Sequence, residues 1–155
     1  MKKFLVSLAF FSLAEAQIPE IEVVNSLKKE IVEDNPKSPE ESQKILTKYF
    51  NDGCRIKVND EKIILKQERF SQYASIAAAF FPKIKKNFEL KISKDISKSD
   101  DGKVELNASL DISKNQKTKI DFVLENKKFS EIICKDVPLS KGQRFMLRGV
   151  FNLLK

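Results

Sequence analysis

The sequence holds few side chains that could carry acid–base or nucleophilic chemistry. There is no histidine among its 155 residues, and histidine is the usual proton shuttle because its unperturbed pKa lies near neutrality. A buried carboxylate with a raised pKa, or a tyrosine, would have to move protons in its place. The candidates for this work are Asp52, Asp121, Tyr49, Tyr73 and Arg55.

Their positions in the apolar pattern argue against catalysis. Ile120 and Phe122 form the apolar side of an alternating segment, so Asp121 between them faces the opposite side of the strand. Arg55 stands in the same relation to Ile56 if that strand is regular. Charged side chains of this kind are mostly solvated surface ions. We therefore expect a protein that is not an enzyme, and we assign no catalytic residue.

Metal and cofactor sites also lack a basis in this sequence. Zinc and iron sites need clustered histidine, cysteine or carboxylate ligands, and the two cysteines lie far apart. Asp100-Asp101-Gly102 lacks the later oxygen ligands of a calcium loop and is better read as a turn. The four glycines form no phosphate-binding loop. We expect no cofactor and no metal.

The N-terminus has the three parts of a secretory signal. Met1-Lys2-Lys3 supplies a positive start, the apolar run covers residues 4–14, and Ala14-Glu15-Ala16 ends in small residues. An apolar run of this length falls short of the ~20 residues that span a bilayer. We expect cleavage near Ala16-Gln17 and a periplasmic or secreted bacterial protein.

Export bears on the two cysteines and on the charge. In an oxidising compartment Cys54 and Cys134 are a possible disulfide, and the alternative is two buried free thiols. The formal net charge is +7, carried mostly by scattered lysines. A nucleic-acid site needs clustered cations and often stacked aromatics, so we expect no nucleic-acid partner. An envelope protein or a membrane surface remains a possible partner for a basic protein.

The periodicity of apolar residues predicts three helices in the first half of the chain. Residues 19–33 follow helical spacing, and Ser38-Pro39-Glu40-Glu41 is a capping box that begins a second helix ending before Asn51. Alternation over residues 54–65 predicts a short strand hairpin. Helical spacing then returns from Gln67 until Pro82 ends the third helix.

The second half of the chain is strand-like. Alternating apolar and polar residues run from Phe88 to Cys134, with turns at residues 100–102, 115–116 and 126–127. Strict alternation of this length predicts an antiparallel sheet with one buried face and one wet face. Three N-terminal helices with a short hairpin, followed by such a sheet, give an α+β domain.

This order resembles the nuclear-transport-factor-two-like superfamily, also called SnoaL-like, over about residues 21–137. The resemblance includes the hairpin 54–65 before the third helix and a closing hairpin, 120–129, in which Phe129 follows the turn. It implies a cystatin-like cone in which a curved antiparallel sheet wraps the third helix, often with a pocket at its open end.

Two groups of residues could form a binding surface. The first would line an apolar ligand pocket in the cone, although the same residues could be plain core: Phe70, Tyr73, Ala77, Phe80, Phe88, Leu90, Leu106, Leu110, Phe122. The second is an amphipathic basic tail, residues 138–155, that would bind a partner or a membrane, or fold back on its own domain: Arg144, Phe145, Met146, Leu147, Arg148, Val150, Phe151, Leu154.

The expected organisation is therefore a signal peptide 1–16, an α+β domain 17–137 and the tail 138–155. We expect an exported non-catalytic binding module that interacts with a protein of the bacterial envelope or of a secretion assembly. Two alternatives stay open: a carrier of an apolar small molecule or lipid in the cone, and an enzyme of the dehydratase or isomerase type. Fold alone does not choose among them.

Overall fold

The computed structural model describes residues 18–36, 38–80, 89–113 and 116–155. The expected signal peptide, 1–16, lies outside these ranges. Two helices come first, α2 (Pro19–Val32) and α3 (Pro39–Tyr49). As the capping box predicts, the Ser38 hydroxyl accepts a hydrogen bond from the Glu41 N–H at 3.2 Å, which satisfies one of the unpaired donors at the start of α3.

The predicted hairpin follows, and it begins earlier than the sequence pattern indicates. Strand β1 (Phe50–Val58) pairs antiparallel with β2 (Glu61–Leu65) through a turn in which Asn59 has a φ of 53°. A short 3-10 helix, η1 (Gln67–Arg69), then leads into helix α4 (Phe70–Phe80).

The second half of the chain supplies four more strands and a final helix. The strands are β3 (Glu89–Lys98), β4 (Val104–Ser113), β5 (Gln116–Glu125) and β6 (Lys128–Lys135). The sheet has the strand order β2-β1-β6-β5-β4-β3. All neighbours are antiparallel except β1 and β6, which run parallel. The sheet is therefore mixed, because a strand from the first half joins one from the second half.

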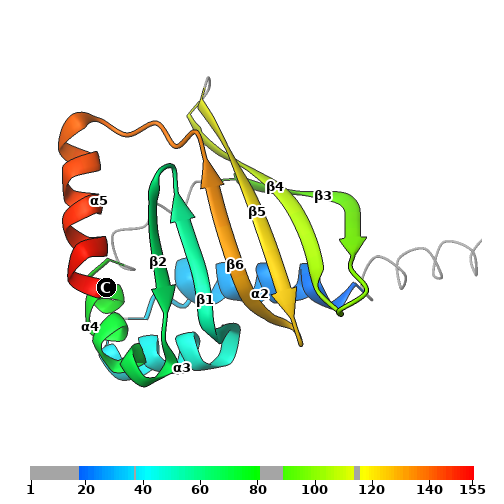
Figure 1. The fold of residues 1–155 in the computed structure, drawn as a ribbon, viewed down its shortest axis with the longest axis horizontal. Helices are drawn as coiled ribbons and strands as arrows, with labels where there is room; N and C mark the ends of the chain where they lie inside the picture. The colour runs from blue at the N-terminus through cyan, green and yellow to red at the C-terminus, as the bar shows by residue number, and fades with distance from the viewer. Residues whose placement is uncertain (1–17, 37, 81–88, 114–115) are drawn as a thin grey trace, which may run out of the picture.

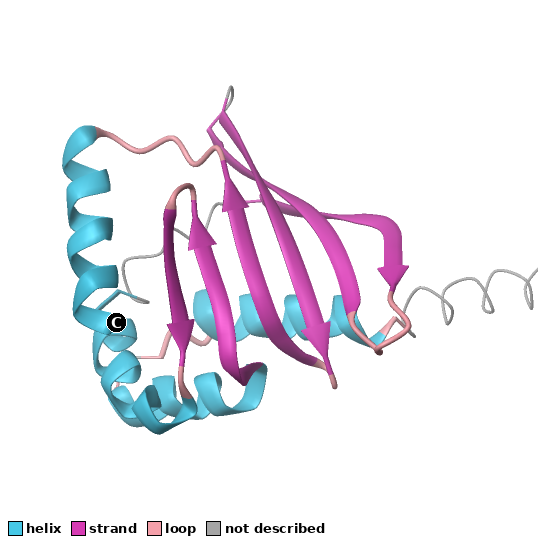
Figure 2. Cartoon of the chain, in the orientation of Figure 1, coloured by secondary structure: helices cyan, strands magenta, loops and turns pink. Residues whose placement is uncertain are grey.

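The α+β class with a curved sheet is confirmed (Figure 2). The inward side chains of β4, β5 and β6 form one apolar core with α2, α3 and α4, and Leu106, Leu124 and Phe129 are almost completely buried in it. Helix α2 runs behind the strands, whereas α3 and α4 pack on each other at one end of the sheet (Figure 1). Helix α4, the third helix in the predicted order, packs on α3 and contributes Phe70, Tyr73 and Ala74 to this core.

The C-terminal segment folds as helix α5 (Lys141–Leu154) and packs on its own domain. Ser140 and Gln143 form a capping box at its start. The helix lies beside β2, the strand at one edge of the sheet (Figure 1), and its Phe151 is 8% exposed within the core. Because an exposed sheet edge can pair with other chains, α5 shields this edge.

Candidate functional site

Most of the residues expected to line an apolar pocket lie in the hydrophobic core. Phe70, Tyr73, Leu106 and Phe122 are buried there, and Leu90 and Leu110 pack partly buried against it. The Phe122 and Phe129 rings lie 5.5 Å apart between centroids, a spacing typical of packed aromatic pairs. Ala77 is half-buried on α4. Phe88 and the Phe80 side chain lie outside the described part of the structure.

Tyr73 holds two elements together. Its hydroxyl donates towards the Ile64 carbonyl of β2 at 3.4 Å and the Leu154 carbonyl of α5 at 3.5 Å. The Arg69 guanidinium lies 5.7 Å from its ring centroid, a cation–π distance. These contacts give Tyr73 a structural role at the joint between α4, the edge strand and the last turn of α5.

Two of the other polar candidates, Asp121 and Asp52, also have structural partners. Asp121 lies on the outer face of the sheet, as the alternation predicts, and its carboxylate is 2.7 Å from the Lys135 ammonium. This contact raises the pKa of Lys135. Asp52 accepts a hydrogen bond from the Gln67 N–H at 2.8 Å and so caps η1. Tyr49 is buried, and its pKa is raised, mainly by this burial and secondarily by the nearby Glu30.

Of the two alternatives for Cys54 and Cys134, the structure has two free thiols and no disulfide between them. Cys134 on β6 is the register partner of Val58 on β1, and Cys54 lies four residues before Val58. Four residues of strand span roughly 13 Å, whereas a disulfide needs Cα atoms within ~7 Å. Burial raises the pKa of Cys54 to about 12 and that of Cys134 to about 11.

The described ranges contain no cluster of three or more histidine, cysteine, aspartate or glutamate side chains placed to hold a metal ion. Among the same residues, no helix combines the length and the apolarity that crossing a membrane requires.

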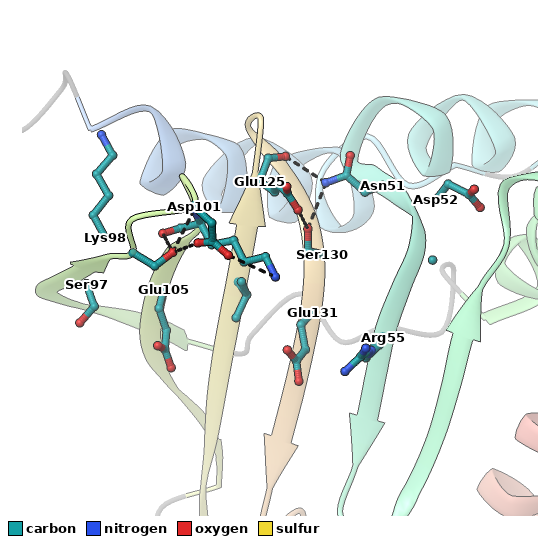
Figure 3. Close-up of a pocket in the computed structure, with 14 residues that line it drawn as sticks. Asn51, Asp52, Arg55, Ser97, Lys98, Asp101, Glu105, Glu125, Ser130 and Glu131 are labelled. Carbon is teal, nitrogen blue, oxygen red and sulfur yellow. Dashed lines mark hydrogen bonds and ion pairs between the residues drawn. The ribbon is translucent and has the colours of Figure 1, made fainter.

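A polar groove of about 690 Å³ lies on the outer face of the sheet (Figure 3). Five carboxylates and three cations line it, so negative charge is in excess: Asp52, Asp101, Glu105, Glu125, Glu131 and Arg55, Lys98, Lys103. Sequence analysis missed this groove because alternation marks these residues only as the wet side of the strands. The curvature that gathers them is not visible in any one strand.

Within this groove Asn51 carries a structural contact. Its side-chain amide donates to the Glu125 carbonyl at 2.9 Å and to the Ser130 hydroxyl at 3.2 Å (Figure 3). It also donates to the Lys128 carbonyl at 3.3 Å. The β5–β6 turn between them places both Asn126 and Lys127 at positive φ, as a two-residue hairpin turn of the primed type requires. Asn51 thus ties β1 to this hairpin.

The eight tail residues divide between two faces of α5. Phe151 is buried, and Leu147, Val150 and Leu154 pack against the core, so these four serve the protein's own fold. The Arg148 guanidinium is 2.9 Å from the Glu61 carboxylate of β2. Phe145 and Met146 are 80% and 61% exposed on the opposite side, together with Leu153 at 76%, and Arg144 is also exposed.

Three exposed apolar side chains and two glycines lie on the side of α5 that faces away from the core. We call them the α5 stripe: Gly142, Phe145, Met146, Gly149 and Leu153. Their spacing of i, i+3, i+4, i+7 and i+11 keeps them on one side of a helix. A Cβ atom added at either glycine would have no neighbour within 4 Å. Among the described residues, nothing covers the two glycine positions of the stripe.

No protein-family model matches the sequence, and no curated protein matches it. Among solved structures, a de novo designed NTF2 fold protein is 13% identical with a TM-score of 0.49, over 84% of this chain and 92% of that chain. A domain with a cystatin-like fold from Nostoc punctiforme PCC 73102 is 8% identical with a TM-score of 0.47, over 90% and 89%.

A protein described as a SnoaL-like polyketide cyclase, from Jannaschia Sp. CCS1, is 13% identical with a TM-score of 0.40, over 83% of this chain and 89% of that chain. These likenesses concern the fold, and they do not identify a ligand or an activity for this chain. The chain's own element order, with two helices, a hairpin, a third helix and four strands, is the order implied by its resemblance to the nuclear-transport-factor-two-like, or SnoaL-like, fold.

Proposed function

We propose that this protein is an exported, non-catalytic binding module that holds a partner protein through the α5 stripe. The observation that carries the proposal is the exposure of Phe145, Met146 and Leu153 on one side of a helix whose other side is anchored in the core. Scattered exposed apolar residues are ordinary, whereas a continuous apolar patch marks an interaction surface. Within the described ranges, Ile64 is the other large apolar side chain left exposed.

The glycines of the stripe favour a partner that approaches closely. Gly149 lies inside the helix, where glycine costs about 1 kcal/mol relative to alanine, and its own chain offers no contact that would exclude a larger residue. A glycine tolerated at such a position permits close approach of another backbone. The stripe therefore suits an apolar helix laid along α5, as in helix-in-groove recognition.

The positive charge of α5 indicates which kind of partner it would bind. Helix α5 and the residue after it contain no acidic residue, and besides Arg148, which pairs with Glu61, they carry the cations Lys141, Arg144 and Lys155. A second copy of the chain would bring like charges together, which disfavours association. We therefore infer a partner with an apolar stripe flanked by acidic side chains. The N-terminal signal pattern puts that partner outside the inner membrane, in the periplasm or beyond.

The test is capture of envelope proteins by the full chain, followed by cross-linking and mass analysis. We expect the double variant Phe145→Ser/Leu153→Ser to lose the captured protein, because it removes two apolar side chains of the α5 stripe. Both side chains are exposed, so their replacement leaves the core intact. Ile64→Ser is the matched control, since it removes an exposed apolar side chain from β2. Equal thermal stability of the three proteins would show that folding is not the cause.

Two outcomes contradict the proposal. Undiminished capture by the double variant would show that the partner binds another surface. Co-sedimentation with lipid vesicles that depends on Phe145 and Leu153, without any captured protein, would replace the partner protein by a membrane surface.

A further inference from the structure

A second groove, separate from the α5 stripe, lies on the outer face of the β1–β2 hairpin. We call it the hairpin groove, and its volume is about 620 Å³, within the range of small-molecule sites. Its side chains come from both hairpin strands, from η1 and β6, and from the end of α5. The basic ones are Arg55, Lys57, Lys62, Lys66, Arg69 and Lys155.

The hairpin groove has an excess of positive charge, with six basic side chains, and it shares Arg55 and Glu131 with the polar groove. Glu131 is its one acidic side chain. Among the described residues, none of the ion pairs involves Arg55, Lys57, Lys62 or Lys66. Elsewhere on the same sheet, Lys91 and Lys135 lie within 3.7 Å and 2.7 Å of carboxylates. What sets the hairpin cations apart from other lysines of the sheet that are unpaired among the described residues, such as Lys117 and Lys119, is that they line one groove together.

The register of the hairpin brings like charges together. Lys57 and Lys62 are directly opposed in the β1–β2 pair, and like charges in opposed positions are destabilising. An anion bound between them would relieve that repulsion. Lysines act as point charges towards phosphate, and an arginine adds a planar fork of donors. Several converging cations match a dianionic group better than a single negative charge.

The floor of the hairpin groove is apolar. Ile64 lies opposite Arg55 in the hairpin register and is 52% exposed, and Leu154 at the end of α5 lies half-buried beside it. Tyr73 bonds the carbonyls of both residues, which holds this floor together. The Arg69 guanidinium is also held in place, by the Gln72 side chain at 3.0 Å.

We infer that the hairpin groove binds a single anionic amphiphile, a phosphate monoester carried on an alkyl or acyl chain. The phosphate lies among the side chains of Arg55, Lys57 and Lys62, and the chain covers Ile64 and Leu154. This site uses residues of β1 and β2 rather than the α5 stripe. It stands or falls independently of the partner protein proposed above.

The direct test is calorimetric titration of the full chain with dodecyl phosphate below its critical micelle concentration. We expect saturable binding that weakens as salt is raised, because screening reduces the attraction between the phosphate and the cations. Binding to Lys57→Gln/Lys62→Gln should be at least tenfold weaker. Lys117→Gln/Lys119→Gln is the matched control, since it removes two exposed lysines from β5 of the same sheet and should bind as the parent does.

A second variant separates the two parts of the ligand. Ile64→Ser should weaken dodecyl phosphate binding several-fold and leave the weaker binding of inorganic phosphate unchanged. Equal affinity for dodecyl phosphate and inorganic phosphate would overturn the amphiphile assignment. Binding to phosphatidic acid vesicles without binding to monomeric dodecyl phosphate would overturn the single-molecule site. Equal losses in the hairpin and control double variants would reduce the groove to general surface charge and overturn the proposal.

Discussion

At the scale of the residue, several polar side chains hold backbone groups of distant segments. Asn51 donates to two carbonyls of the β5–β6 hairpin, and Asp52 caps η1. Asn59 both donates to and accepts from the backbone of Val137, at 3.1 Å and 2.8 Å. Side chains in such contacts join strands that are distant in sequence.

Asn51 gives the first residue-scale prediction. Asn51→Ala should lower the free energy of unfolding by about 1–3 kcal/mol, because it leaves part-buried carbonyls of the β5–β6 turn without a donor. Urea denaturation followed by circular dichroism measures this loss. Asn107→Ala, at an exposed position of β4, should change stability by much less. Equal effects of the two substitutions would contradict the role given to Asn51.

The free thiols give a prediction with a defined pH window. Burial raises the pKa of Cys54 to about 12, above the unfolded value of 9.0. The folded state keeps this thiol protonated while the unfolded state ionises it. Its contribution to stability is therefore complete below pH 9 and is lost as the pH rises from 9 towards 12.

At pH 10 this loss amounts to about 1 kcal/mol for Cys54. Urea denaturation at pH 7 and pH 10 should show a smaller drop for Cys54→Ala than for the parent protein. Thiol counting without reductant should find two reactive groups after unfolding and slow reaction before it, because the thiolate is the reactive form. If no reactive thiol were found in the unfolded, non-reduced protein, the two cysteines would be joined in a disulfide, contrary to this prediction.

At the scale of the element, α5 does two things with its two faces. The inner face covers the edge strand β2 and contributes Phe151 to the core. The outer face presents the α5 stripe to solvent. The sequence left open whether the tail packs on its own domain or binds elsewhere. The inner face of α5 packs on the domain, and the outer face is the surface proposed for a partner.

The difference between the two faces of α5 can be measured as the change in stability when a phenylalanine on each face is replaced. Phe151→Ala should cost about 3–5 kcal/mol of stability, as for other buried phenylalanines, because its side chain is 8% exposed. Phe145→Ala should change stability by less than about 0.5 kcal/mol, because its side chain is 80% exposed. Similar melting temperatures for the two variants would mean that α5 does not pack on the domain in solution.

At the scale of the whole molecule, the fold closes through one parallel pair. Strand β1 comes from the first half of the chain and β6 from the second, and their pairing places the hairpin beside the four-stranded meander. Asn51 and Asn59 support the junction near the two ends of β1. Both surfaces proposed for binding, the α5 stripe and the hairpin groove, lie at the β2 end of this sheet.

The amino-acid sequence by itself determined the local elements. The capping box at Ser38 placed the start of α3, and alternation after residue 88 placed the strands and put Asp121 on the wet face. These signals are local, because capping needs neighbouring residues and alternation follows from the two-residue repeat of a strand. The α+β class followed from the order of these elements.

The tertiary structure alone decided what depends on contacts between distant segments. The parallel register of β1 and β6 separates Cys54 from Cys134, and the packing of α5 beside β2 sorts its apolar residues into buried and exposed sets. The hairpin cations come together with the end of α5 for the same reason. Periodicity assigns each residue to a face of its own element, but the pairing of elements determines which faces are covered and which remain open for binding.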